Sequence, residues 1–107
     1  MAYFSPFMRS VSVTGGAKLL STLLALLDAN LPTRLGLLII QMDPASAGNL
    51  YVGNSAVAAN NCGANLIASG SYTVNPSEDG LILTTDVYLL VSAGTIQANI
   101  TALPKGM

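Results

Sequence analysis

The sequence predicts a mainly β protein: a single β-sandwich or jelly-roll-like domain with one short buried helix near the N-terminus. Three observations support this fold class. Short β-prone runs, about seven in all, recur at a spacing of about 8–12 residues between turn residues. A helical period occurs in residues 18–27 and does not return, which disfavours a βαβ fold. The length of 107 residues fits one domain, and no repeat or linker divides it.

The first two expected elements are a strand and a helix. Residues 9–14 alternate polar and apolar side chains, as a strand with one covered face does. Residues 18–27 are rich in leucine and alanine, and their leucines follow the spacing i, i+3, i+4 and i+7. We therefore expect a helix that is buried on most sides. Its core would include Leu23, Leu24 and Leu27 from the helix and Leu38 and Ile40 from the next strand.

The middle of the chain predicts a hairpin. Residues 35–42 are a continuous apolar run of strand length, which favours a central strand covered on both faces. Residues 43–48 have the composition of a turn, and residues 49–53 are β-prone, so the two runs could pair across that turn. The structural turn residues are Asp43, Pro44, Gly48 and Gly53, and we expect both glycines to serve backbone geometry rather than ligand binding.

The second half predicts further short strands. Residues 72–74, 81–84 and 87–91 are β-prone runs bounded by polar or glycine-containing turns. Residues 95–102 alternate apolar and polar side chains, which suits an edge strand or a half-exposed one.

The composition predicts a protein that associates with others. Charged residues make up 8% of the chain and hydrophobic residues 51%, and the formal net charge is −1. A surface with so little charge promotes association, so we expect a homo-oligomer or an assembly-bound state. The four basic residues are scattered singly, which argues against nucleic acid as a partner. The apolar stretch 17–27 is shorter than the roughly 20 residues of a membrane span, so we expect no membrane partner.

The sequence offers no catalytic, cofactor-binding or metal-binding residues that we would assign. Histidine is absent, which removes the commonest general base and metal ligand. Cys62 stands alone, and the adjacent acids Glu78 and Asp79 are typical of a solvated turn. Gly15 and Gly16 precede a helix but lack the pattern of a phosphate-binding loop. We therefore expect a protein that is not an enzyme.

Residues 1–8 are expected to form an N-terminal arm, with the β-sandwich domain spanning residues 9–107. Tyr3, Phe4 and Phe7 are apolar groups that face both sides of an extended chain, so they are candidate partner-binding residues. The alternative is that the arm folds back onto the domain's own sheet.

Residues 42–57 carry a recognisable pattern. The string from Met42 through Asp43, Pro44, Gly48, Tyr51-Val52-Gly53 and Ser55 to Val57 resembles the Asp-Pro-Ala-Asn-x-Gly-x-x-Tyr-Val-Gly-x-Ser-x-Val segment of small virion structural proteins of tailed bacteriophages. Residues 66–72 resemble that family's Leu-x-x-Gly-x-Ser turn with Ser69 and Gly70 in altered order. The resemblance implies a β-rich component of the virion, whose partners are the major capsid protein or a neck or tail component.

The predicted function is therefore a non-enzymatic structural subunit of a phage particle, and a capsid decoration or minor capsid protein is the leading form. A neck or tail-fibre-associated subunit is the first alternative. A small carbohydrate- or receptor-binding β-module is the second, with Tyr51, Tyr72 and Tyr88 as candidate sugar contacts, although each lies in an apolar strand pattern.

Overall fold

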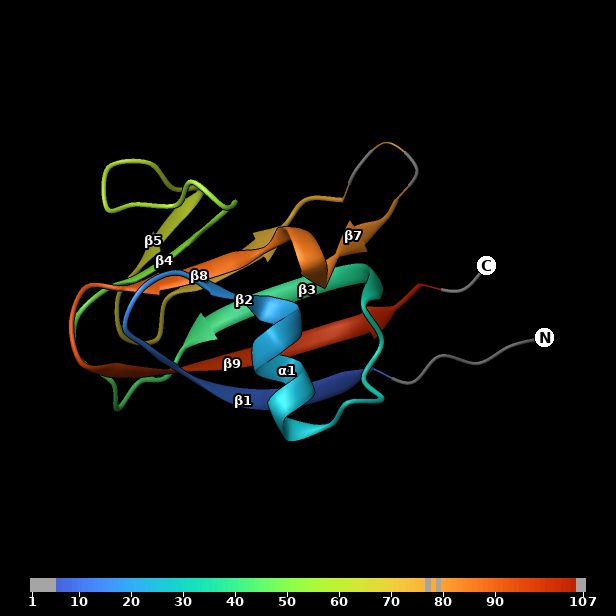
Figure 1. Cartoon of the computed structure of the whole chain (residues 1–107), viewed down its shortest axis with the longest axis horizontal. Coiled ribbons are helices and arrows are strands. Elements are labelled where there is room, and N and C mark those ends of the chain that lie inside the picture. Colours follow the sequence, from blue (N-terminus) through green and yellow to red (C-terminus); the bar gives the residue numbers. More distant parts are fainter. Residues whose placement is uncertain (1–5, 77, 79, 106–107) are drawn as a thin grey trace.

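The computed structural model describes residues 6–76, 78 and 80–105. These residues are mainly β, and they form two antiparallel sheets and one α-helix (Figure 1). The elements in chain order are β1 (Phe7–Thr14), β2 (Lys18–Leu19), α1 (Leu20–Leu27), β3 (Arg34–Met42), β4 (Leu50–Gly53), β5 (Ala64–Leu66), β6 (Ser71–Val74), β7 (Ile82–Leu83), the 3₁₀ turn η1 (Thr84–Asp86), β8 (Tyr88–Val91) and β9 (Thr95–Pro104).

The five-stranded sheet, here called sheet A, has the order β1-β9-β3-β6, and β7 pairs with β3 beyond the end of β6. β1 and β9 pair along their whole length, from Phe7 opposite Ala102 to Thr14 opposite Thr95. Residues 95–102 were expected to form an edge or half-exposed strand. The half-exposed alternation is confirmed, but β9 is not an edge, because it lies between β1 and β3.

The four-stranded sheet, sheet B, has the order β2-β8-β4-β5. The expected hairpin between residues 35–42 and 49–53 is wrong, because β3 belongs to sheet A and β4 to sheet B. The intervening turn carries the chain from one sheet to the other. β8 supplies the long-range partner for β4, with Leu50 opposite Val91, and this pairing cannot be read from local sequence.

β3 was expected to be covered on both faces, and the structure differs. Leu35, Leu38, Ile40 and Met42 are fully buried, whereas the opposite face is partly open and Leu37 is 38% exposed. The register between β3 and β9 also shifts between Leu35 and Leu37. An apolar run is therefore a necessary but not a sufficient sign of a strand buried on both faces.

The helix is shorter and more exposed than its sequence predicted. Lys18 and Leu19 form β2 instead, and α1 begins at Leu20, whose N–H donates to the Val87 carbonyl at 2.8 Å. Leu20, Leu23 and Leu24 are buried, but Leu26 is 79% exposed and Leu27 is 51% exposed. α1 packs on β1 with one face. Its contacts are therefore one-sided, although its sequence is apolar around most of the helix.

One hydrophobic cluster joins the buried faces of both sheets and α1. It includes Leu23, Leu24, Leu38 and Ile40, which confirms four of the five residues expected to share a core. Leu27 is wrong, because it lies in the last turn of α1 and faces solvent.

Candidate functional site

The first candidate site is a pocket of about 260 Å³ at the interrupted edge of sheet A. β6 pairs with β3 at Leu38 to Gln41, and β7 pairs with β3 at Arg34 and Leu35. The chain between β6 and β7 leaves the sheet, so no continuous strand covers this edge of β3 within the described residues. The pocket lies where this gap faces the end of β4 and the start of β8.

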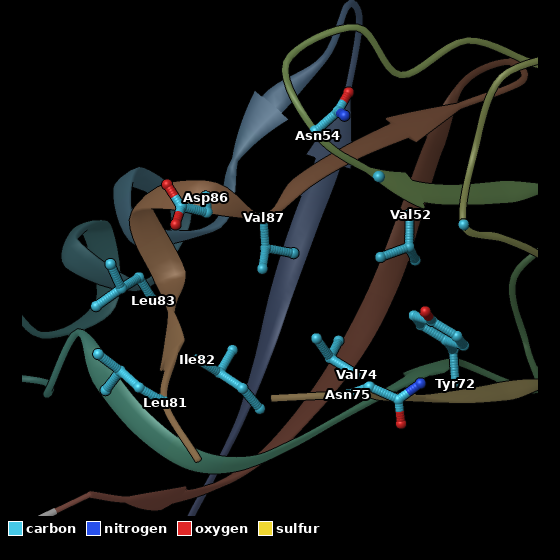
Figure 2. Close-up of a pocket in the computed structure, with 12 residues that line it drawn as sticks. Val52, Asn54, Tyr72, Val74, Asn75, Leu81, Ile82, Leu83, Asp86 and Val87 are labelled. Carbon is cyan, nitrogen blue, oxygen red and sulfur yellow. The ribbon is translucent and has the colours of Figure 1, made fainter. Parts of the chain in front are cut away.

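The interior of the pocket is apolar. Val52, Tyr72, Val74, Ile82 and Val87 extend into a common space from β4, β6, β7 and the segment before β8 (Figure 2). Val52, Ile82 and Val87 are buried, whereas Tyr72 and Val74 are half-buried. The volume is slightly below the roughly 300–1,000 Å³ of typical ligand pockets. The pocket therefore accommodates a small apolar group or one large side chain of a partner.

Polar groups line the rim of the pocket. Asn54, Asn75 and Asp86 are exposed side chains at its border (Figure 2). The Asn54 Oδ1 accepts a hydrogen bond from the Ala56 N–H at 2.9 Å, so this side chain is held by its own turn. Among the described residues, no three or more His, Cys, Asp or Glu side chains gather into a group that would hold a metal ion. The chemistry that this pocket offers is apolar contact with hydrogen bonding at the border.

The three tyrosines weighed as sugar contacts do not come together. Tyr72 lines the pocket, but Tyr51 is buried in β4 and Tyr88 is half-buried in β8. The predicted preference for a core or semi-buried position is confirmed for these side chains.

The predicted turn residues act on the backbone. The Asp43 Oδ1 accepts from the Ala45 N–H at 3.1 Å, and the Asp43 carbonyl accepts from the Ser46 N–H at 3.0 Å. Gly48 has a φ of +97°, and a Cβ there would lie 2.8 Å from the Ser92 Oγ. At Gly53 a Cβ would lie 3.0 Å from Val57 Cγ2. The positive φ favours a backbone role for Gly48, whereas Gly53 is constrained by side-chain packing and also lines the pocket, so the expectation that neither glycine binds a ligand stays a prediction.

The predicted partner-binding residues have different outcomes. Tyr3 and Phe4 lie outside the described residues. Phe7 begins β1, pairs with Ala102 and belongs to the hydrophobic core at 9% exposed. Its assignment as a partner contact is corrected, because its side chain packs in the core of the fold. The strand β1 also begins two residues before the predicted boundary at residue 9.

A second candidate site, which the sequence did not single out, is the outer face of sheet A. The strand register places uncharged side chains side by side across β1, β9, β3 and β6 on the face turned away from the core. Among them, Met8 is 73% exposed, and Leu37 and Leu103 are directly paired and both partly exposed. The members of this outer face are Met8, Ser10, Ser12, Thr14, Leu37, Ile39, Gln41, Ser71, Thr73, Thr95, Gln97, Asn99, Thr101 and Leu103.

Hydrogen bonds order the polar half of the outer face. The Ser10 Oγ donates to Gln97 Oε1 at 3.2 Å, and the Gln97 Nε2 donates to the Ser12 Oγ at 2.6 Å. A shallow hollow of about 310 Å³ opens beside Met8, Gln41 and Thr101, and the charged Arg9 lines it at the margin of this face. The periodicity of residues 95–102 could have revealed the polar row, but the neighbours of that row depend on long-range strand order.

Comparisons with known proteins returned no matching family model, no matching curated protein and no matching solved structure. No helix in the described ranges has both the length and the hydropathy needed to cross a membrane.

Proposed function

We propose that this protein is a non-enzymatic structural subunit that packs into a larger assembly, with its two sheets arranged as a β-sandwich. The sandwich is supported by the single hydrophobic cluster that both sheets share. A jelly-roll connectivity stays a prediction.

The observation that carries the proposed function is the uncharged outer face of sheet A. A solvated antiparallel sheet usually presents polar and charged residues on its open face. Here that face combines Met8, Leu37 and Leu103 with an ordered row of Ser, Thr, Asn and Gln side chains. Charged residues are depleted in the centre of protein interfaces, and such a face loses little solvation when another subunit covers it.

The assembly that we propose is a phage particle. This part of the proposal is supported by the resemblance of residues 42–57 to small virion proteins, and its leading form is a capsid decoration or minor capsid protein that stabilises the shell by packing. A neck or tail-fibre-associated subunit is the alternative within the same particle. Immunogold labelling of particles from cultures that encode the chain tests this, because labelling of the shell, the neck or nothing separates the possibilities.

The packing role is tested with a charge placed on the outer face. We expect the wild-type protein to associate as its concentration rises in sedimentation velocity, and Leu37→Glu to shift it to the monomer. Thr22→Glu, on the exposed side of α1, is the matched control and should leave association unchanged. A wild-type protein that stays monomeric at high concentration and binds no particle would contradict the proposal.

A small carbohydrate- or receptor-binding module is a second candidate, and the pocket beside Tyr72 favours it. Apolar walls with amide and carboxylate groups at the border suit a sugar ring or a small side chain. NMR titration with monosaccharides tests this candidate, since shifts confined to pocket residues and lost in Tyr72→Ala would support it.

A further inference from the structure

The two sheets have four edges, and three of them are short. β2 has two residues, β5 has three, and the far edge of sheet A is divided between β6 with four residues and β7 with two. β1 forms the fourth edge with eight residues in continuous register, and it contains no proline. Natural sheets usually protect their edges with short strands, proline, bulges or charges, because an open edge pairs with other chains. β1 has little of this protection.

The register identifies which backbone groups β1 presents outward. The Asp43 N–H donates to the Gln97 carbonyl at 2.9 Å, so the hydrogen-bonding groups of Gln97 point toward β3. Because hydrogen bonding alternates along an antiparallel strand, the N–H and C=O groups of the neighbouring residues Ile96 and Ala98 point toward β1. Their partners on β1 are Val13 and Val11. The alternate residues of β1 therefore direct their N–H and C=O groups to the open side: Met8, Ser10, Ser12 and Thr14.

The side chains along this edge leave the central groups accessible. Ser10 and Ser12 direct their hydroxyls to Gln97 within the sheet, so their side chains do not cover their own backbone groups. The Arg9 guanidinium donates to the Met8 carbonyl at 2.9 Å, which protects the N-terminal end of the edge. The accessible stretch is centred on Ser10 and Ser12.

α1 provides an apolar surface next to the same edge. Its C-terminal turn extends past β1 on the core side of sheet A (Figure 1). This turn carries Leu26 and Leu27, which are 79% and 51% exposed. A strand added beside β1 would lie next to this turn and would cover both leucines with any apolar side chains on its core-facing side.

We propose that β1 is a docking edge for an extended strand of a different subunit in the assembly, so the inference rests on the proposed structural role. The incoming strand pairs with the backbone of Ser10 and Ser12. It directs apolar side chains toward Leu26 and Leu27. Its uncharged polar side chains lie on the opposite side, where the added strand extends the outer face of sheet A. This mode supplies main-chain hydrogen bonds for affinity and alternate side chains for specificity.

A peptide with the sequence of residues 95–104 is a suitable probe. It is uncharged along its side chains, it alternates apolar and polar residues, and in the fold it already pairs with the other side of β1. Fluorescence anisotropy should detect saturable binding of the labelled peptide to the intact protein. A peptide of the same composition with the alternation scrambled should not bind.

Proline substitution distinguishes the two edges of sheet A. Ser10→Pro and Ser12→Pro each remove an outward N–H and should weaken peptide binding by about tenfold or more. Thr73→Pro, on the opposite edge of sheet A, is the matched control and should bind as the wild type does, because the register of β6 with β3 also points its N–H outward. Leu26→Asp leaves β1 intact and should also weaken binding.

The amide hydrogens give a readout that does not depend on the variants. Hydrogen exchange at Ser10 and Ser12 should slow when the peptide binds, while Val11 and Val13 are already protected. Absence of peptide binding, or equal losses in Ser10→Pro and Thr73→Pro, would overturn the docking edge. Dimers of the chain alone that Ser12→Pro abolishes would instead assign the edge to a second copy and overturn the proposed occupant. Association that Leu37→Glu abolishes while the peptide fails to bind would leave the structural role standing and remove this inference alone.

Discussion

The two edges of sheet A border the same central pair, β9 and β3, but they are built differently. β1 is continuous, is registered with β9 over its full length and is packed by α1. The other edge is divided between β6 and β7, and the chain between them leaves the sheet. A continuous edge leaves backbone groups open to a partner strand, whereas a divided edge leaves a side-chain pocket. Edge continuity therefore decides which kind of contact each side of the sheet offers.

The largest expected effect is on the β1 side. Leu24 is 2% exposed and lies in the core between α1 and the sheet. Leu24→Ala should lower the free energy of unfolding by about 2–5 kcal/mol, since it removes buried contacts and leaves a cavity. Leu26→Ala is the control on the exposed face, and it should change the value by no more than about 0.5 kcal/mol. Urea denaturation of the two variants measures both, and similar losses would mean that α1 does not hold β1 through one face.

A smaller effect is expected where the divided edge begins. A Cβ at Gly70 would lie 2.9 Å from the carbonyl oxygen of Ile67, and this backbone atom cannot move freely. Gly70→Ala should therefore cost about 1–3 kcal/mol. The matched control is Gly16→Ala, because a Cβ there meets nothing within 4 Å. Thermal unfolding followed by circular dichroism checks the pair, and a neutral Gly70→Ala would mean that the turn before β6 relaxes easily.

The smallest effect concerns the residue just before that glycine. Ser69 has a φ of +66°, a conformation that costs an ordinary residue about 1–2 kcal/mol and glycine little. Ser69→Gly should relieve this strain. Glycine also gains freedom in the unfolded chain, which offsets part of the benefit, so the stability should rise by up to about 1 kcal/mol. Ser71→Gly, within β6, should instead lower it by about 0.5–1 kcal/mol. A loss at both positions in chemical denaturation would refute the strain at Ser69.

The sequence was informative wherever local rules decide the structure. The alternation in residues 9–14 and 95–102 predicted strands, and the turn at residues 43–48 was found with Gly48 at positive φ. It failed where distant partners decide. No local pattern states that β9 lies between β1 and β3, or that β4 pairs with β8 rather than with β3.

The candidate sites follow the same division. The outer face of sheet A is formed by uncharged side chains from separate strands, so its extent depends on strand order. The pocket depends on the gap between β6 and β7, which neither strand's sequence specifies. Low charge content predicts a protein that associates with others, but it carries no information about where the associating surface would lie.

The position of β9 has a consequence for how the chain reaches its native state. β1 is made first, β3 follows, and the strand that lies between them is made after every other strand described. During synthesis, sheet A therefore lacks its centre until residues 95–104 have left the ribosome. Until then β1 and β3 keep their apolar faces uncovered, and such exposed apolar surface makes a nascent chain prone to aggregate. A chain truncated before β9 would lack the strand that joins β1 to β3 in sheet A.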